Sequence, residues 1–382
     1  MLKKLLPVIL LLPALLLTSC ASANSGVTQT AITTQSTTIS TSATTVQTTQ
    51  KTTQTTAPIQ DPASDFQVLD KSSFCALYYL NYTEDYKFDE FIASGGASST
   101  RELVEYAYKA FPGIKLDLSA LGYGCSSFCA QSNDGDIIFG RNFDMSSDYS
   151  GSYLIVHTAP ENGYESYSTV NLKFLGVTSP EKPTDTTSPL SLAPYVPLDG
   201  INSAGLAICV LQLNFPEIHQ NGAATDMTST TIIRNVLDNA ATVEEAIEIF
   251  NKCNINTDGY AYHYMVGDAS GKSAVIEFVN NEMTVSYKTE DVQVCANTYV
   301  TEAGMDFYKD TNAADSLNRM NAIVSSVRAS DFDLTVEASF KALKAASNNN
   351  TRWSIVYNLT EKTMSFVANK NFDKIFSFSF SK

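Results

Sequence analysis

The sequence predicts an α+β domain built from layers of sheet and helix, preceded by a signal peptide and a tether. Short apolar or alternating runs, typical of strands, occur in groups on both sides of a block of helical patterns. They do not alternate one by one with helices, as they would in a parallel βαβ fold. In addition, 44% of the residues are apolar and 10% are aromatic, which is the composition of a globular chain and excludes disorder of the whole molecule.

Residues 1–20 have the features of a bacterial lipoprotein signal peptide. Two lysines precede an apolar run that is too short, and interrupted by two prolines, to be a convincing membrane span. The run ends in LTSC, which resembles a lipobox and implies cleavage before Cys20 and lipidation of its thiol. An ordinary secretory signal with an incidental cysteine is the alternative. We therefore expect an extracytoplasmic protein that is lipid-anchored to the bacterial cell membrane.

Residues 21–61 predict a flexible, disordered tether. Half of residues 21–60 are serine or threonine, one lysine is the only charge, and no aromatic residue occurs. Such a segment cannot bury enough apolar surface to fold. As a coil it would span roughly 35 Å. Folded sequence begins near Pro62, and the simplest division is a partly helical segment over 62–124 followed by one main domain over 125–382.

The strand and helix patterns of the folded part can be placed in order along the chain. Cap-like polar residues at 98–102 precede the first helical pattern. A later helix begins at Thr242, with Glu244 and Glu245 in its first turn, where the helix dipole favours acidic side chains. Expected strands cover 126–132, 137–141, 153–158, 205–213, 263–267, 273–279, 352–357 and 375–380, and further helices cover about 228–240, 242–252, 313–327 and 335–346.

Charge and histidine content exclude or disfavour several classes of partner. The chain carries 40 acidic and 25 basic residues, a formal charge of −15, so it repels phosphate backbones and no nucleic-acid partner is expected. Only three histidines occur, which argues against a histidine-rich metal site. We expect no metal and no cofactor, and the sequence does not determine the oligomeric state.

Six cysteines follow the signal peptide. Cys125 and Cys129 lie on one expected strand, roughly 13 Å apart along it, which is too far for a disulfide. No C-x-x-C spacing occurs. The simplest interpretation of the others in apolar strands or helices is that they are buried small side chains, and these are Cys129, Cys209, Cys253 and Cys295.

The run GCSSFCAQSNDGDIIFGRNFDM, which begins at Gly124, predicts a β-hairpin. A two-residue turn at Asp134-Gly135 would place Asp144 opposite Cys125 on the neighbouring strand. In this ideal register Arg141 falls on the other face, so a bulge near the end of the second strand would be needed to bring its charge to the thiol.

A thiol, a cation and a carboxylate at one end of a hairpin point to nucleophilic catalysis by cysteine. A cation lowers the pKa of a thiol and favours the thiolate, and a carboxylate can orient the group that takes the proton. None of the histidines lies in a motif that suggests pairing with Cys125. If the peptide bond before Cys125 is cut, its free α-amine, with a pKa of about 7.7–8.0, can act as the base. The alternative is a buried thiol beside an ordinary ion pair of Arg141 and Asp144.

These residues resemble the amino end of the mature choloylglycine hydrolase and penicillin V acylase family, the linear-amide members of the N-terminal nucleophile (Ntn) hydrolases. The spacing of Cys125, Arg141 and Asp144 matches that family. Further matches follow in the same order: GLAICVLQLNFP with Asn214, VCANTYV with Asn297, SLNRMNAI with Arg319, and the strand pair TRWSIVYNLTEKTMSF over 351–366.

The resemblance implies a four-layer αββα sandwich and a cysteine-nucleophile amidohydrolase. Cys125 would attack the carbonyl of a linear N-acyl amide, a small molecule, and its own α-amine would serve as base. The resemblance also implies that Asn214 and Asn297 form the oxyanion hole and that Arg141 stabilises the thiolate. Asp144 would contact the amine, and Arg319 would support the nucleophile.

One departure concerns the residues before the nucleophile. The bile-salt enzymes of the family carry their cysteine after an initiator methionine, whereas here 124 residues precede it. This is similar to precursors related to the fungal isopenicillin N acyltransferase, which are cut before the cysteine. The resemblance therefore implies autocatalytic cleavage between Gly124 and Cys125, with 62–124 as a propeptide.

Two other functions fit the same sequence. An acyltransferase would use the same acyl-cysteine and pass the acyl group to an amine. A substrate-binding lipoprotein would also carry a lipobox and tether, although such proteins usually show two α/β lobes. The acylated substrate is not determined. Apolar and aromatic loop residues between 160 and 200 could line an acyl pocket, or could equally serve for packing, and they include Tyr164, Tyr167, Phe174 and Tyr195.

Overall fold

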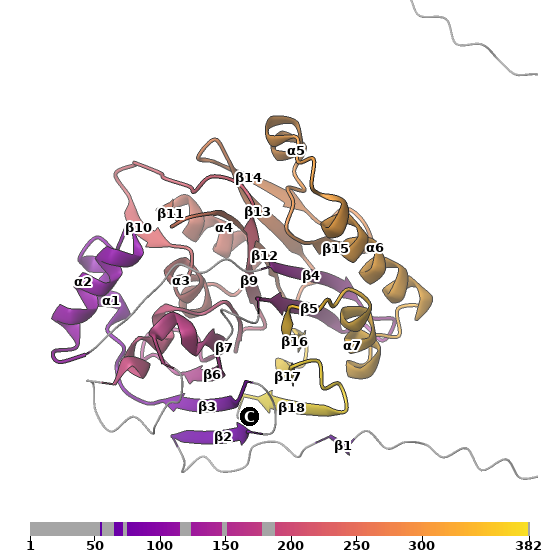
Figure 1. Ribbon diagram of the computed structural model, residues 1–382, viewed down its shortest axis with the longest axis horizontal. Coiled ribbons are helices and arrows are strands. Elements are labelled where there is room, and N and C mark those ends of the chain that lie inside the picture. Colours follow the sequence, from indigo (N-terminus) through magenta and orange to yellow (C-terminus); the bar gives the residue numbers. More distant parts are fainter. Residues whose placement is uncertain are drawn as a thin grey trace, which may run out of the picture. The chain divides into compact units, whose positions relative to one another are not determined.

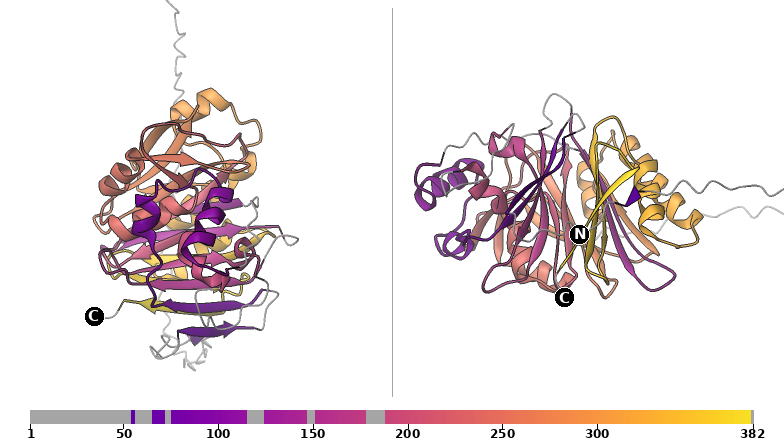
Figure 2. Two further views of the ribbon diagram at one scale, coloured as in Figure 1. Left: turned by 90° about the vertical axis from the view of Figure 1, so that its left-hand side faces the viewer. Right: turned by 90° about the horizontal axis from the view of Figure 1, so that it is seen from below.

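Two β-sheets lie face to face in the computed structural model, and helices cover the outer face of each, which confirms the expected αββα sandwich (Figures 1 and 2). The structure describes residues 54–55, 65–71, 75–114, 124–146, 151–177 and 188–380. The predicted signal peptide, Cys20 and nearly all of the tether lie outside these residues. The described residues belong to one compact unit, Thr52–Lys382. No helix among them is both long and apolar enough to span a membrane.

The smaller sheet has seven strands and contains the hairpin expected from the sequence. The strands β4 and β5 pair with each other in antiparallel fashion and lie between β15 and β16. In order across the sheet the strands are β1 (Gln54–Thr55), β18 (Lys374–Ser379), β17 (Thr363–Ala368), β16 (Thr351–Asn358), β5 (Ile137–Asp144), β4 (Gly124–Gln131) and β15 (Val292–Cys295).

The larger sheet has nine strands. All its neighbours pair in antiparallel fashion except β3 and β6, which are parallel. In order the strands are β14 (Glu282–Tyr287), β13 (Ser273–Val279), β12 (Ala261–Gly267), β9 (Ala207–Leu213), β8 (Asp199–Asn202), β7 (Ser166–Asn171), β6 (Tyr153–Thr158), β3 (Leu77–Tyr82) and β2 (Phe66–Asp70).

The helices form the two outer layers. α6 (Ala314–Ala329) and α7 (Val336–Ala345) pack on the smaller sheet, and α3 (Thr231–Asn239) and α4 (Val243–Asn251) pack on the larger one (Figure 2). α4 starts with a capping box between Thr242 and Glu245, at the place expected from the sequence. The remaining elements are α1 (Phe88–Ala93), α2 (Thr100–Ala110), α5 (Glu302–Tyr308), the short 3₁₀ helices η1 (Leu172–Leu175) and η2 (Pro189–Tyr195), and the parallel pair β10 (Thr225–Thr228) and β11 (Cys253–Asn256).

The central hairpin is buried on both faces because the smaller sheet lies between two layers. Cys125 and Phe143 face the other sheet and belong to the core between the sheets. Phe128, Ala130 and Ile138 point the opposite way, into the core under α6 and α7. Successive side chains of a strand alternate between its faces, so both faces of this strand pair are covered, and even its polar residues Ser126, Ser127 and Asn142 are buried.

The turn of this hairpin corrects the register expected from the sequence. The loop has three residues, Asn133 to Gly135, closed by a hydrogen bond from the Ser132 amide to the Asp136 carbonyl at 2.7 Å. Gly135 has a φ of 103°, the positive value that ends a three-residue hairpin loop. The predicted two-residue turn is therefore wrong, and every cross-strand pair shifts by one residue.

The shifted register brings Arg141 to the thiol without a bulge. Cys125 pairs with Phe143, Ser127 pairs with Arg141, and Gly124 pairs with Asp144. Residues directly opposite each other share a face, so Cys125 and Arg141 both point between the sheets. The expectation that Asp144 lies opposite Cys125 and that Arg141 needs an irregular strand end is thus wrong.

The segment over 62–124 is built into the larger sheet. Its strands β2 and β3 form one edge of that sheet, and β3 pairs with β6 over six residues (Figure 1). Its helices α1 and α2 pack beside η2, where Tyr195 lies between the rings of Phe88, Phe91, Tyr106 and Phe111 at centroid distances of 5.5–6.5 Å.

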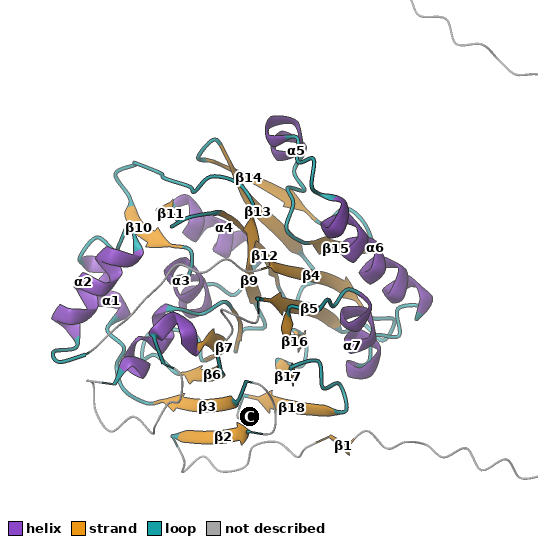
Figure 3. Cartoon of the chain, viewed as in Figure 1, coloured by secondary structure: helices purple, strands orange, loops and turns teal. Residues whose placement is uncertain are grey.

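Every strand and helix range expected from the sequence is present, with ends that differ by three residues or fewer. Figure 3 shows how these helices and strands are arranged. Further elements had no expected counterpart: the strands Phe66–Asp70, Leu77–Tyr82, Ser166–Asn171, Asp199–Asn202, Thr225–Thr228, Cys253–Asn256 and Glu282–Tyr287, and the helices Phe88–Ala93 and Glu302–Tyr308.

Candidate active site

Cys125 is the second residue of β4, and its side chain is fully buried between the two sheets. Arg141 lies on the same face of β5, and its Nη2 donates to the Cys125 sulfur at 3.1 Å. Nη1 donates to Asp199 Oδ2 at 2.6 Å and to the carbonyl of Leu198, and Nη2 also donates to the carbonyl of Val210 at 3.0 Å. These contacts fix the guanidinium group against the thiol.

The electrostatic surroundings keep the thiol protonated at neutral pH in the uncut chain. Burial raises the pKa of Cys125 to about 11, and the charge of Arg141 only partly offsets this. Burial opposes the charge of Arg141, but Cys125 when it is ionised and the carboxylate of Asp199 raise the pKa of Arg141 above its usual range, so it stays a cation. A thiol in this state needs a base beside it before it can act as a nucleophile.

Asp199 is a buried partner of the site that the sequence did not indicate. Its Oδ1 accepts from the Tyr357 hydroxyl at 2.8 Å and from Thr169, and its Oδ2 accepts from Arg141 and from Trp353 Nε1 at 3.4 Å. Arg141 and Asp199 both have no exposed side-chain surface. Breaking such a pair is costly because the remaining charge has no compensation.

Arg141→Met is therefore expected to lower the free energy of unfolding by about 3–5 kcal/mol, since it leaves Asp199 buried without its cation. Urea unfolding followed by circular dichroism measures this. Arg101→Met is the matched control, because the pair of Arg101 and Glu105 is exposed, and it is expected to change nothing measurable. A loss no larger than that of the control would show that Asp199 does not depend on Arg141.

Two of the predicted residues contact the backbone of Cys125. Asn297 Oδ1 accepts the Cys125 N–H at 2.8 Å, and Arg319 Nη1 donates to the Cys125 carbonyl at 2.5 Å. Arg319 Nη2 also donates to Asn297 Oδ1 at 2.9 Å. On its other side, Asn297 Nδ2 donates to the Gln212 carbonyl at 2.7 Å, and Arg319 Nε donates to Asp315 at 2.8 Å. The main chain of the cysteine is thus held at both its nitrogen and its oxygen.

Asp144 lies at the end of β5, opposite Gly124. Its Oδ1 accepts from Thr351 Oγ1 at 2.6 Å, and its Oδ2 accepts from Asn348 Nδ2 at 3.0 Å. Arg319 Nη1 lies 3.5 Å from the same Oδ2. Burial raises the pKa of Asp144, against the opposing effect of these partners. Asn348 lies just before β16 and Thr351 is the first residue of that strand. Neither residue was expected in the site.

The Gly124–Cys125 peptide bond lies between Asp144 and Asn297. A Cβ atom placed on Gly124 would lie 3.3 Å from Asp144 Cβ and 3.4 Å from Asn297 Oδ1. In the uncut chain the nitrogen of Cys125 donates to Asn297. Asp144 is therefore close to this peptide bond, but the nitrogen itself is hydrogen-bonded to the asparagine.

A polar cavity of about 380 Å³ opens at this peptide bond. Asn214 lies in its wall with an exposed side chain, and its Oδ1 accepts from Gln212 Nε2 at 3.3 Å. Four of the six predicted site residues line the cavity, whereas Cys125 and Arg141 are buried behind it. The lining residues are Gly124, Asp144, Met145, Ser146, Gln212, Asn214, Asn297, Asp310, Asn312, Asp315, Ser316, Arg319, Asn348 and Asn350.

The aromatic residues suggested for an acyl pocket do not line this cavity. Tyr195 is buried against α1 and α2, and its hydroxyl donates to the Tyr86 carbonyl at 2.6 Å. Tyr167 donates to the Ser379 carbonyl at 3.1 Å and packs on the C-terminal strand. Tyr164 and Phe174 are not among the lining residues either. The suggestion is wrong for Tyr167 and Tyr195, because their rings are used for packing, and it stays a prediction for Tyr164 and Phe174.

The six cysteines among the described residues are all buried and none forms a disulfide, which confirms the expectation for Cys129, Cys209, Cys253 and Cys295. The three histidines have partners elsewhere: Asn81 and Glu165 for His157, Glu217 for His219, and Glu277 and Ala296 for His263. The hydrogen bonds that the structure shows thus give the thiol no histidine base.

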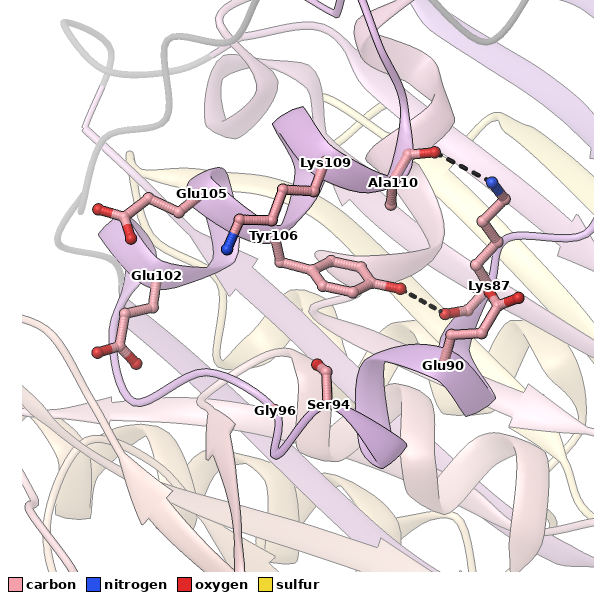
Figure 4. A pocket seen from close by; sticks show the side chains of 9 residues that line it. All are labelled: Lys87, Glu90, Ser94, Gly96, Glu102, Glu105, Tyr106, Lys109 and Ala110. Atoms are coloured by element: carbon pink, nitrogen blue, oxygen red, sulfur yellow. Dashed lines mark hydrogen bonds between the residues drawn. The ribbon is translucent and has the colours of Figure 1, made fainter.

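A second cavity, of about 530 Å³, lies on the N-terminal segment between α1 and α2 (Figure 4). The Tyr106 hydroxyl donates to the Lys87 carbonyl at 2.8 Å, and Lys87 Nζ donates to the Ala110 carbonyl at 3.1 Å (Figure 4). Its lining is mostly charged and contains none of the predicted site residues: Lys87, Glu90, Ser94, Gly96, Glu102, Glu105, Tyr106, Lys109 and Ala110.

The paired sheets between helical layers are the Ntn-hydrolase fold, and comparisons with known proteins agree. The family model "Acyl-coenzyme A:6-aminopenicillanic acid acyl-transferase" matches residues 130–373, more than half of the chain. The chain belongs to this family. The match begins after Cys125, so it does not include the expected nucleophile.

Individual relatives are similar over part of the chain. A penicillin V acylase from Pectobacterium atrosepticum is 28% identical over 184 residues, which cover 42% of this chain and 49% of that protein. The chain thus matches about half the length of this curated relative. The expected resemblance to penicillin V acylases is confirmed.

One solved structure gives the same fold, and a second is similar at a lower score. Penicillin V acylase from Agrobacterium tumefaciens superimposes with a TM-score of 0.50 and 18% identity, over 68% of this chain and 87% of that one. A variant of conjugated bile acid hydrolase from Clostridium perfringens gives a TM-score of 0.46 and 17% identity, over 68% and 97% of the two chains.

Proposed function

We propose that this chain is a cysteine-nucleophile amidohydrolase that cleaves a linear N-acyl amide through an acyl-cysteine, after cutting itself between Gly124 and Cys125. The observation that carries the proposal is the environment of that peptide bond. The bond borders a polar cavity, its nitrogen donates to Asn297, and the thiol that follows it accepts a hydrogen bond from Arg141.

The first step is an intramolecular acyl transfer. The Cys125 sulfur attacks the carbonyl carbon of Gly124, the C–N bond breaks, and the nitrogen takes the proton that the thiol gives up. The product is a thioester between Gly124 and the cysteine sulfur. Water then hydrolyses this thioester, which leaves a carboxylate on Gly124 and restores the thiol of Cys125 beside a new α-amine.

The second step uses this amine as the base for an external amide. With a pKa of about 7.7–8.0, a free α-amine can accept the thiol proton near neutral pH, which the buried thiol cannot lose unaided. The thiolate attacks the amide carbonyl, the amine returns the proton to the leaving nitrogen, and water releases the acid. Arg141 is placed to stabilise the thiolate, at 3.1 Å from the sulfur.

The remaining site residues surround the reacting centre. The amide group of Asn297 and the main chain of Asn214 are the proposed oxyanion donors, and such a donor is worth about 2.7–4 kcal/mol in the transition state. Asp144 is proposed to hold the new amine, since its carboxylate lies beside Gly124. Arg319 fixes the Cys125 carbonyl and Asn297 together.

The proposed substrate is a small N-acyl amide, and penicillin V is the first compound to test because similar proteins are penicillin V acylases. The proposed location is outside the cytoplasm, anchored to the bacterial membrane through a lipid on Cys20, and this rests on the lipobox and the Ser/Thr-rich tether alone.

An acyltransferase is the second candidate, favoured by the name of the family model that matches the chain. Both activities share the acyl-cysteine and differ in whether water or an amine accepts the acyl group. Product analysis with an added amine acceptor separates them. The substrate-binding lipoprotein is disfavoured, because the fold is one sandwich of two sheets and not two α/β lobes.

Intact mass under denaturing conditions, with amino-terminal sequencing, tests the proposal on the purified chain. The expected result is two polypeptides, the second of which begins Cys125-Ser126-Ser127. A single uncut chain that hydrolyses amides would refute the role of the α-amine and require another base. A single uncut chain without amidase activity would refute the proposed function.

A further inference from the structure

A buried histidine and glutamate lie behind the segment that carries Asn297. His263 is on β12 and Glu277 on the neighbouring strand β13, and neither side chain has exposed surface. His263 Nδ1 lies 2.9 Å from Glu277 Oε1, and His263 Nε2 lies 2.7 Å from the carbonyl oxygen of Ala296. The ring thus bridges the larger sheet and the residue immediately before Asn297.

The partners of Glu277 indicate that it is ionised. Its Oε1 accepts from the Val300 N–H at 2.9 Å, and its Oε2 accepts from the N–H and the hydroxyl of Thr301 at 2.9 and 2.6 Å. Burial alone would raise the pKa of Glu277, but the hydrogen bonds from His263 and Thr301 outweigh it and hold the pKa below its usual value.

Both ring nitrogens of His263 therefore donate. A carbonyl oxygen can only accept, so Nε2 carries a proton, and an ionised carboxylate can only accept, so Nδ1 carries one as well. The ring is then an imidazolium cation, and its positive charge balances Glu277 in a site without solvent.

The pair holds both ends of the segment over 296–301, which follows β15. His263 holds the carbonyl of Ala296 at its start, and Glu277 holds the amides of Val300 and Thr301 at its end. Between these points Asn297 projects toward the cavity and accepts the N–H of Cys125. The strand β15 and its pairing with β4 end at Cys295, and none of the other described strands pairs with residues 296–301. The side chains of His263 and Glu277 therefore bind backbone groups that a neighbouring strand would otherwise bind.

We infer that His263 and Glu277 are positioning residues that form a buried imidazolium–carboxylate clamp and aim Asn297 at the reacting peptide bond. They do not touch the thiol or the scissile bond. The kinetic part of this inference rests on the proposed function, and the protonation of the ring does not.

Nuclear magnetic resonance of the protein labelled with ¹⁵N-histidine tests the clamp directly. The chain has only three histidines, so the ring signals can be assigned with His157→Phe and His219→Phe variants. One ring is expected to show two protonated nitrogens with slowly exchanging protons at pH 7, and these signals are absent in His263→Gln. A single protonated nitrogen on His263 would overturn the inference.

The rate of cleavage between Gly124 and Cys125 tests the positioning role, and it requires no knowledge of the substrate. His263→Phe keeps a ring of similar size but removes both donors, and it is expected to slow cleavage by about 10²-fold, the effect of a misplacement of about 1 Å. His263→Gln restores one donor and is expected to recover part of the rate. Cleavage of folded His263→Phe at the wild-type rate would overturn the positioning role.

His157→Phe is the matched control. His157 also pairs with a glutamate, at 2.6 Å from Glu165, but it lies on β6 and contacts none of the site residues. Cleavage in this variant is expected to stay within about twofold of the wild type. If His263→Phe does not fold, the resonance measurement on the wild type still tests the clamp, and the cleavage rate of His263→Gln still tests the positioning role. If the wild-type chain is never cut, the proposed function fails, and the ring signals still report whether the clamp exists.

Discussion

Cys125→Ala is expected to leave the chain at full length and to remove its amidase activity. Both proposed steps begin with attack by the Cys125 sulfur, so no acyl-cysteine can form without it. Deletion of a covalent nucleophile costs about 10⁶-fold in kcat in well-studied hydrolases. Intact mass reports the cleavage, and release of 6-aminopenicillanic acid from penicillin V reports the activity.

Cys129→Ala is the matched control for this variant. Cys129 lies on the same strand and the same face as Cys125 and is equally buried, so its replacement has a similar packing cost. Cys129→Ala is expected to be cut and to stay active. Cleavage of Cys125→Ala before residue 125, or failure of both variants to be cut, would contradict the assignment of the nucleophile.

Residues 125–382 alone are expected not to fold into a soluble domain. Without the preceding segment, β6 loses its partner β3 and becomes an exposed edge of the larger sheet, which favours aggregation. Tyr195 at the same time loses the four rings that surround it. Exposure of a large core side chain costs about 1.5–3 kcal/mol, a substantial part of the stability of a typical domain.

Co-expression separates this prediction from a trivial failure. Residues 62–124 supplied as a second chain are expected to restore a soluble complex, whereas removal of residues 1–61 is expected to leave folding intact. For the same reason, the two pieces of a cut wild-type chain should elute together in gel filtration. A soluble 125–382 fragment with a cooperative unfolding transition would show that the segment is dispensable.

The sequence was informative where local chemistry determines the structure. The capping box at Thr242 and the apolar periodicity of the helices and strands are local features, and these elements appear at the expected places. The strands β2 and β3 were not expected, because both are short and their place in the sheet depends on β6, far along the chain.

The site could be predicted in part for a similar reason. Family spacing identified residues that the structure brings together around Cys125, including Asn297 and Arg319 from distant segments. Asp199 and His263 could not be recognised from the local sequence, because the role of an isolated acid or histidine in an apolar run depends on the side chains packed against it. The aromatic residues between 160 and 200 could not be assigned to a pocket from the sequence, because an exposed pocket and a packed core use the same residue types.

The pairing of the hairpin strands decides whether Cys125 and Arg141 can meet. With three loop residues between Ser132 and Asp136 the thiol and the guanidinium share a face, whereas a two-residue turn at Asp134-Gly135 in the same sequence would shift every pair by one and turn the arginine into the helix-covered core. The loop itself is therefore free to vary in length, because a residue inserted between Ser132 and Asp136 leaves the strand pairs unchanged. A single residue inserted within either strand would separate the two groups unless a bulge absorbs it, so natural relatives that keep this contact should vary in the loop and not in the strands.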